Sequence, residues 1–310
     1  MLLNANSVSG LETKRPIASC RYVLMTAAYN EEENIGKTIQ SVLLQTVLPA
    51  RWVIVSDGSI DRTNEIVQRY EKAYSFIRFL PLTRPPGRSF GSKVRALHAG
   101  SQMLKDVNYD FIGNLDSDVS VGPSYFEEII SRLIERPSLG LAGGFVVEEV
   151  SGQFRDRKQN RVYSVPHAAQ LVRRECYEAL GGYAILEYGG EDWHAQTCAK
   201  MKGWDVEAFP ELKIFHHRHT GEADNAFRDS FRQGRLAYSL GSDPLFEMLK
   251  CLGRLTEKPF IIGAMIKLGG FSWSWLRGER RPVSDDFIEF LRREQKARIR
   301  HVFARLSGSR

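Results

Sequence analysis

The sequence predicts an α/β protein: a Rossmann-like, mostly parallel sheet flanked by helices, followed by a helical C-terminal extension. Over the first 120 residues short apolar runs alternate with segments of helical periodicity, the pattern of parallel strands joined by crossover helices. From about Asn225 onward the sequence has helical character. With 43% hydrophobic and 26% charged residues among 310, the composition excludes a disordered chain and allows one large core or two modest ones.

The first predicted elements follow a loose leader over residues 1–21. Strands are predicted over residues 22–26, 51–55, 76–80 and 109–115, and helices over residues 35–43, 61–70 and 92–104. Between the third strand and the third helix, residues 83–91 contain two prolines and two glycines, which predicts a surface loop. The regular alternation ends near Val121.

The following segment is less regular. Strands are predicted over residues 143–150 and 212–215, and helices over residues 171–180 and 191–202. Gly181 and Gly182 end the first of these helices. We therefore expect one α/β domain over residues 22–222, with halves 22–120 and 121–222, and a helical extension over residues 223–310.

Two carboxylates close the fourth predicted strand. Asp116 and Asp118, separated by Ser117, follow the apolar run from Tyr109 to Leu115. Open α/β folds bind ligands at the carboxyl ends of their strands, and acid groups this close repel each other unless a cation or hydrogen-bond donors neutralise them. Their oxygens suit Mg²⁺ or Mn²⁺, which in turn suit a diphosphate. Taken alone, the triplet also fits a polar turn after a strand.

Five segments, in order, carry a family resemblance. They are Thr26-Ala-Ala-Tyr-Asn-Glu-Glu-Glu-Asn-Ile, Ser41-Val-Leu-Leu-Gln-Thr, Val55-Ser-Asp-Gly-Ser-Ile-Asp, Asp116-Ser-Asp118 and Gly190-Glu-Asp-Trp193. They resemble inverting glycosyltransferases of family 2, which have the GT-A fold. The resemblance implies a hexosyltransferase that moves sugar from a nucleoside-diphosphate sugar to a glycan or lipid-linked glycan acceptor, in surface polysaccharide or glycolipid synthesis. Residues 22–120 would bind the nucleotide sugar and residues 121–222 the acceptor.

The same resemblance implies six nucleotide-binding residues. They are Thr26, Tyr29, Glu31, Asp57, Lys93 and Asp116. Tyr29 would lie against the base, Asp57 would accept the ring N–H, and Glu31 would approach the ribose or base. The family more often has Asp where this chain has Ser56, which removes one nearby negative charge. A core aromatic and a solvent-exposed lysine are the alternatives for Tyr29 and Lys93.

The resemblance also implies a divalent cation, Mn²⁺ or Mg²⁺, that bridges the two phosphates. Asp118 would coordinate it, Asp116 would hold the ribose, and His216 would supply a further ligand at the end of an apolar strand. Such a cation neutralises the charge that grows on the departing nucleoside diphosphate. Packing is the alternative role for His216.

Glu191 and Asp192 open a predicted helix after two glycines. Displacement with inversion needs one base that takes the proton of the acceptor hydroxyl, a contribution of about 10²–10⁴-fold. Asp192 matches the family's base more closely, while Glu191 is the alternative base or an acceptor contact. Trp193, next to them, is a further candidate for the acceptor. An acidic pair that caps a helix N-terminus is the structural alternative.

Residues Phe231-Arg-Gln-Gly-Arg235 are similar to the Gln/Arg-rich motif of processive members of the family, where cations bind the diphosphate. The tryptophan of that motif is missing, because Leu236 follows Arg235. We expect Arg232 and Arg235 to contact either the diphosphate or the acceptor. An ordinary basic helix is the alternative.

The C-terminal extension predicts a membrane contact. Residues 260–276 form a 17-residue segment with one charge, whereas a spanning helix takes about 20 apolar residues. Trp273 and Trp275 favour a position in the headgroup zone, and a buried helical hairpin is the alternative. From Arg277 onward ten basic residues stand against five acidic ones, while the preceding 276 residues hold 33 against 32. The expected partner is an anionic membrane surface and not a nucleic acid, and a solvated helix face is the alternative on charge alone.

The four cysteines show no metal-like spacing, and the N-terminus shows no secretory signal. We expect a cytoplasmic protein with reduced thiols, held peripherally on the inner face of the cytoplasmic membrane.

Two rival functions stay open. A sugar nucleotidyltransferase would show a Gly-rich, basic phosphate loop after the first strand, where this chain has the acidic segment Ala27-Ala-Tyr-Asn-Glu-Glu-Glu33. A non-catalytic nucleotide-sugar binder or membrane scaffold would not need intact Asp116, Asp118 and Asp192. Detection of donor hydrolysis would exclude this second rival.

Overall fold

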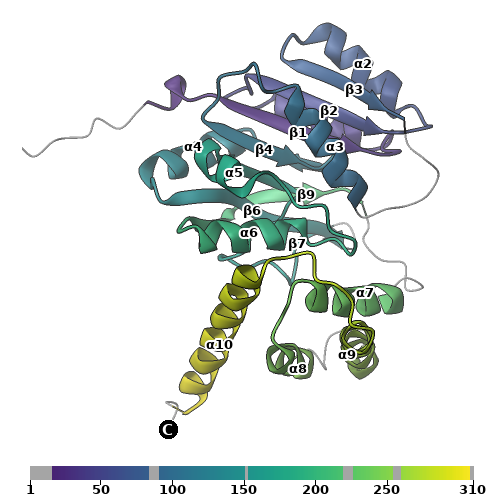
Figure 1. Ribbon diagram of the computed structural model, residues 1–310. Helices are drawn as coiled ribbons and strands as arrows, with labels where there is room; N and C mark the ends of the chain where they lie inside the picture. The colour runs from purple at the N-terminus through teal and green to yellow at the C-terminus, as the bar shows by residue number, and fades with distance from the viewer. Residues whose placement is uncertain (1–15, 84–90, 151–152, 219–225, 254–259, 308–310) are drawn as a thin grey trace, which may run out of the picture.

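The computed structural model of the protein describes residues 16–83, 91–150, 153–218, 226–253 and 260–307 (Figure 1). Within these residues nine strands form one sheet in the order β3-β2-β1-β4-β8-β6-β9-β5, and β7 pairs with β6. The strands are β1 (Tyr22–Ala28), β2 (Arg51–Asp57), β3 (Ile77–Leu82), β4 (Phe111–Leu115), β5 (Val119–Val121), β6 (Leu139–Val150), β7 (Gln153–Asp156), β8 (Ala169–Arg173) and β9 (Asp205–His216). The predicted α/β class is confirmed.

The part of the sheet from β3 to β4 is parallel, as predicted. β1 pairs with β2 and β4, and β2 pairs with β3. The helices of this half are α1 (Ile35–Leu43), α2 (Thr63–Ala73) and α3 (Gly91–Gln102). Because alternate residues of a strand face opposite sides, Leu24 and Trp52 belong to one buried core and Met25 and Val53 to the other. Burial on both faces fixes the register, and with it the edge at which the polar strand ends meet.

Beyond β4 the sheet is mixed. β8 runs antiparallel to β4 and β6, β5 runs antiparallel to β9, and β6 is parallel to β9. Residues 171–173, predicted as the start of a helix, are the end of β8, and α5 (Arg174–Leu180) begins after them. That prediction was wrong because a short apolar run does not distinguish a buried strand from a helix. α4 (Tyr125–Glu135) and α6 (Glu191–Met201) complete this half.

The predicted helical extension is present. Its described helices are α7 (Ala226–Ser239), α8 (Pro244–Leu252), α9 (Phe260–Leu276) and α10 (Asp285–Ser307). In Figure 1 all four lie below the sheet, and α10 begins next to α6. α7 and α9 pack very closely: a Cβ on Gly234 would meet the carbonyl oxygen of Lys267 at 1.9 Å, and one on Gly270 would meet that of Phe231 at 2.1 Å. Glycine is therefore required at both crossing positions.

Several expectations concern parts of the chain that are described only partly. Residues 1–15 of the leader and most of the predicted 83–91 loop lie outside the described residues. Residues 17–19 form a 3-10 turn and Cys20 is buried, so the end of the leader packs on the core. None of the four cysteines forms a disulfide. In the described parts of the chain no helix is long and apolar enough to cross a membrane.

Candidate active site

The loops after β1 and β2 form one side of the candidate site. Asn30 has a φ of 53°, a left-handed conformation that asparagine tolerates better than most residues. Its side-chain oxygen accepts the N–H of Ile60, and its own N–H donates to Ser59 Oγ, so the two loops are tied together. Half-exposed Tyr29 lies on the first loop and Asp57 ends β2. The two predicted base contacts are therefore on joined loops at the carboxyl edge of the sheet.

Thr26 has a different place from the one expected. It is completely buried in β1, where its hydroxyl donates to the Leu115 carbonyl at 2.7 Å and accepts from Trp52 Nε1 at 3.0 Å. These contacts join β1 to its neighbours β4 and β2. The Thr26 hydroxyl thus holds the sheet together and is not presented to a nucleotide.

Lys93, in the first turn of α3, lies between the two acidic parts of the site. Its Nζ is 2.7 Å from Asp116 Oδ1. Burial raises the pKa of Asp116, and the Lys93 ammonium opposes that rise. Burial works against the ammonium, but the negative charges of Asp116, Glu191 and Asp192 outweigh it and raise the pKa of Lys93. Lys93 is therefore charged at neutral pH and interacts with carboxylates from two elements.

A second cluster surrounds Asp118. The antiparallel pairing of β5 with β9 brings His216 Nε2 to 3.3 Å from Asp118 Oδ2. Arg218, to which the sequence gave no role, lies with Nη2 2.7 Å from Glu31 Oε1 and Nε 3.9 Å from Asp118 Oδ2. Burial would raise the pKa of Asp118, but His216 and Arg218 together lower it. Burial and then the Asp118 charge raise the pKa of Glu31 to about 7.

The acidic pair Glu191 and Asp192 opens α6, directly after Gly190 with a φ of 86°. Asp192 Oδ1 accepts the N–H of Trp193 at 2.7 Å. Burial, and then the charge of Glu191, raise the pKa of Asp192 to about 6. A carboxylate with a pKa close to neutral is a better proton acceptor than an ordinary one, which suits the predicted base.

Two buried polar residues, Asn114 and His167, link Asp116 to Glu191. Asn114 Nδ2 donates to Asp116 Oδ1 at 3.0 Å and to the carbonyl of His167. His167 Nδ1 lies 4.0 Å from Glu191 Oε1. Burial and then the Lys93 charge lower the pKa of His167 well below its usual value, so the ring is neutral at pH 7. Sequence reasoning missed both Asn114 and His167, because neither stands in a motif; position next to Asp116 was the available signal for Asn114.

Three residues predicted to contact diphosphate or acceptor lie on the side of the extension. Trp193 packs in an apolar cluster with Phe287 of α10. Arg232 Nη1 donates to the Tyr188 carbonyl at 2.5 Å, and the Arg235 guanidinium lies 4.5 Å from the centre of the Tyr188 ring. Both arginines therefore lie next to the loop that leads into α6, whereas Trp193 packs α6 against α10.

Asp118 and His216 are the residues that fit a divalent cation. They offer a carboxylate oxygen and an imidazole nitrogen 3.3 Å apart, a donor set suited to Mn²⁺. Two protein ligands leave coordination positions for phosphate oxygens, the usual arrangement where a metal is bound together with a phosphorylated substrate. In the described residues no group of three or more His, Cys, Asp or Glu forms a complete protein-only metal site.

The Glycosyl transferase family 2 model matches residues 24–186, which is more than half of the chain. The chain belongs to glycosyltransferase family 2. Relatives of this family 2 chain include the poly-beta-1,6-N-acetyl-D-glucosamine synthases of Staphylococcus epidermidis, 30% identical, and of Staphylococcus aureus strain COL, 31% identical. Each match extends over 120 residues, which are 39% of this chain and 27% of the relative. The chain thus spans about a quarter of the length of these curated relatives.

Two solved structures share the fold. One is S. aureus TarS 1–349 in complex with UDP-GlcNAc, with a TM-score of 0.52, 16% identity, and coverage of 72% of this chain and 67% of that one. The other is the mannosyltransferase PcManGT from Pyrobaculum calidifontis in complex with GDP-Man and Mn²⁺, with a TM-score of 0.54, 15% identity, and coverage of 87% and 78%. The predicted GT-A fold of this family 2 chain is confirmed.

Proposed function

We propose that this family 2 protein is a metal-dependent, inverting glycosyltransferase that moves a sugar from a nucleoside-diphosphate sugar to an acceptor hydroxyl. The placement of Lys93 carries the proposal. Its ammonium lies 2.7 Å from the donor-side carboxylate Asp116, and the charges of Glu191 and Asp192 also stabilise it. In a direct displacement the donor diphosphate and the base must both lie close to one anomeric carbon. The Lys93 ammonium interacts with carboxylates on both sides, which supports that proximity.

On the donor side, Asp118 and His216 would hold the cation together with the phosphates. A bound cation would neutralise the charge that grows on the leaving diphosphate. Lys93 and Arg218 add fixed positive charge at the same edge of the sheet. The joined loops after β1 and β2 would take the nucleoside.

On the acceptor side, Asp192 would take the proton of the acceptor hydroxyl as its oxygen attacks the anomeric carbon. The bond to the diphosphate breaks in the same step, so one displacement inverts the configuration. The raised pKa of Asp192, about 6, supports this role. Glu191, held 4.0 Å from the neutral His167 ring, would accept a hydrogen bond from another acceptor hydroxyl and is the alternative base.

The relatives support a substrate class. Poly-beta-1,6-N-acetyl-D-glucosamine synthases align with 120 residues of the chain, and the two structural neighbours hold UDP-GlcNAc or GDP-Man. We propose transfer of a hexose unit in the synthesis of a surface polysaccharide or glycolipid. The acceptor would be a glycan or a lipid-linked glycan.

The nucleotidyltransferase alternative is less well supported. A triphosphate needs a basic or glycine-rich cradle after the first strand. Here Glu31 is buried there, and the neighbouring Glu32 lies 3.3 Å from Arg62. The loop between β1 and α1 is therefore acidic where such an enzyme binds phosphates.

Thermal shift with nucleoside diphosphates, with and without Mn²⁺, tests the proposed function. A ligand at ~100 times its Kd stabilises the native protein by roughly 2.7 kcal/mol, so binding is readily seen. We expect at least one of UDP and GDP to raise the melting temperature, and Mn²⁺ to increase the shift. The matching sugar nucleotide should then be slowly hydrolysed. Binding without hydrolysis or transfer would favour the non-catalytic binder, and no nucleotide binding would contradict the proposal.

We also propose that α8 and α9 form the membrane-facing surface. Their exposed apolar side chains are Leu245, Met248, Leu252, Ile261, Ile262, Met265, Trp273, Trp275 and Leu276. Lys267, the charge within α9, is turned inward: it is 8% exposed and lies 3.4 Å from Glu247 of α8. Exposed Arg277 and Arg280 follow the apolar face, an arrangement that suits a helix lying in the headgroup zone of an anionic leaflet. Attachment would then be peripheral, at the inner face of the cytoplasmic membrane.

Substitutions on α9 test this surface better than truncation, because removal of α10 would strip Phe287 from the cluster that supports α6. We expect full-length Leu276→Glu to bind anionic liposomes clearly more weakly than the parent. The matched control is Leu44→Glu, since Leu44 of the catalytic domain is about as exposed. High salt should release only part of the parent protein, because it screens charge and leaves the apolar contact. Equal liposome binding by both variants would contradict the proposal.

A further inference from the structure

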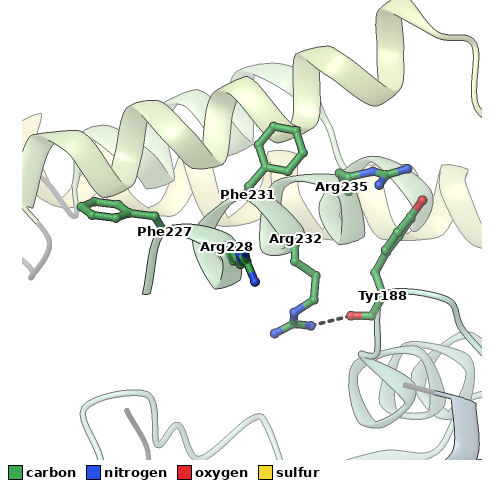
Figure 2. Close-up of a pocket in the computed structure, with 6 residues that line it drawn as sticks. All are labelled: Tyr188, Phe227, Arg228, Phe231, Arg232 and Arg235. Carbon is green, nitrogen blue, oxygen red and sulfur yellow. Dashed lines mark hydrogen bonds between the residues drawn. The ribbon is translucent and has the colours of Figure 1, made fainter. Parts of the chain in front are cut away.

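A pocket of about 380 Å³ lies between α7 and the loop that precedes α6 (Figure 2). It is lined by Tyr188, Phe227, Arg228, Phe231, Arg232 and Arg235. Three of the six lining residues are arginines, and the other three are aromatic. The pocket therefore offers hydrogen-bond donors and positive charge next to apolar ring surfaces.

The pocket adjoins the proposed base. Tyr188 is three residues before Glu191, and its carbonyl accepts from Arg232 at 2.5 Å. α7 also packs directly on Gly190, where an added Cβ would lie 2.9 Å from Leu236 Cδ1. A ligand held in this pocket would thus lie next to the segment that carries Glu191 and Asp192.

The charge of the arginines that line this pocket favours an anionic ligand. Arg232 is paired with Asp229, and Arg235 Nη2 lies 2.6 Å from Glu279 Oε1. Arg228 is exposed, and the ion pairs that the described residues of α7 form involve Arg232 and Arg235 and not Arg228. An incoming phosphate would gain this exposed guanidinium, a planar set of donors suited to phosphate oxygens.

The other side of α7 leads to the proposed membrane surface. In Figure 2 Phe231 points toward α9, whereas Arg228 and Arg232 point away from it. The close crossing at Gly234 and Gly270 leaves α9, with its exposed apolar face, directly behind α7. Phe227, 46% exposed, extends the apolar rim of the pocket. Cations and apolar surface are therefore separated across a single helix.

We propose that this pocket binds the phosphate or diphosphate group of an amphiphilic acceptor, with the apolar chain of that acceptor passing Phe227 toward the α8–α9 surface. The proposal rests on the proposed glycosyltransferase function, for which it names the acceptor class. The membrane surface would then place the lipid, and the pocket would orient the acceptor hydroxyl toward Asp192.

Binding of three soluble probes to the full-length protein tests the proposal by calorimetry. The probes are geranyl phosphate, geraniol and inorganic pyrophosphate. We expect geranyl phosphate to bind at least about tenfold more tightly than either of the others, because it alone supplies both the charge and the chain. Arg228→Ala should weaken geranyl phosphate binding about tenfold, and Arg228→Lys should weaken it less. Phe227→Ala should weaken geranyl phosphate without changing pyrophosphate binding.

The matched control is Arg300→Ala, which removes an exposed arginine from α10 and should leave the binding of all three probes unchanged. Equal affinities for geranyl phosphate and pyrophosphate would show a simple phosphate site and overturn the proposal. So would equal losses in Arg228→Ala and Arg300→Ala, or no geranyl phosphate binding at all. Nucleoside diphosphate binding with Mn²⁺ is measured on the same samples. If it persists while the probes fail, the acceptor site is wrong and the proposed function stands; if it is also absent, the proposed function itself fails.

Discussion

The two sides of the proposed site hold their carboxylates in opposite ways: the donor edge carries Glu31, Asp116 and Asp118, and the acceptor end carries Glu191 and Asp192. At the donor edge each carboxylate is close to a cationic or imidazole side chain: Lys93 for Asp116, His216 for Asp118 and Arg218 for Glu31. At the acceptor end Asp192 accepts a backbone N–H, and Glu191 faces a neutral histidine. Lys93 is the group whose charge reaches both.

The consequence is visible in two aspartates that are both partly buried, Asp118 and Asp192. His216 and Arg218 hold the pKa of Asp118 below its ordinary range, whereas burial and Glu191 raise the pKa of Asp192 to about 6. A carboxylate that stays ionised is suited to coordinating a cation. One that titrates near neutrality suits proton transfer. The two aspartates therefore suit different chemistry, whereas the sequence alone could separate them only by resemblance.

The largest expected effect separates the two ends directly. Asp192→Asn keeps the shape and removes the base, so turnover should fall by roughly 10²–10⁴-fold while nucleoside diphosphate affinity stays within about twofold. Steady-state kinetics and thermal shift on the same preparation measure both quantities. Glu187→Gln, which neutralises an exposed carboxylate of the same loop, is the control and should change neither. A parallel loss of nucleotide affinity in Asp192→Asn would mean that the two ends are not functionally distinct.

The next effect concerns the donor edge. Asp118→Asn should weaken Mn²⁺-stimulated nucleotide binding by at least about tenfold, because even residues that merely orient metal ligands contribute 10–100-fold. Turnover should fall with it. Nucleotide binding is titrated with and without Mn²⁺, and exposed Asp106→Asn serves as the control. Normal Mn²⁺-dependent turnover in Asp118→Asn would remove the metal from this edge.

The sequence predicted the donor edge better than the acceptor end. Its strands are buried on both faces and bounded by turn residues, so the positions of Asp57, Asp116 and Asp118 at the sheet edge followed from local pattern. The α/β class could be predicted for the same reason, whereas the GT-A fold was predicted from the resemblance to family 2 glycosyltransferases. Thr26 shows what such a pattern does not predict. Its position in a motif does not reveal that its hydroxyl makes hydrogen bonds to both neighbouring strands.

What the sequence did not predict depends on contacts distant along the chain. Arg218 contacts Glu31, which is 187 residues away along the chain, and His167 comes near Glu191 just before β8, whose residues 171–173 the sequence pattern predicts as helix. The inward turn of Lys267 needs Glu247 from another helix. No local periodicity encodes such pairings, since they arise from tertiary packing of separate elements.

The smallest predicted effect is a shift in pH dependence. The base must be ionised, so kcat should rise with pH through the pKa of Asp192, about 6 in the free protein. The negative charge of Glu191 is the second cause of that raised pKa, after burial. Glu191→Gln removes this charge, which lowers the pKa of Asp192 and moves the acid limb of the profile to lower pH. At a pH below the parent's midpoint, the variant should keep a larger share of its own maximal turnover.

The measurement is kcat at saturating donor. Glu31, with a pKa of about 7, would change the affinity for the donor with pH, and this change would be mixed into the pH profile of kcat/KM. Glu187→Gln again supplies the control, and its acid limb should stay in place. If Glu191 were the base instead, Glu191→Gln would lose turnover by roughly 10²–10⁴-fold at every pH, and Asp192→Asn would retain activity with a shifted limb. The two assignments therefore predict exchanged results for the same pair of variants, and one set of pH profiles decides which carboxylate takes the proton.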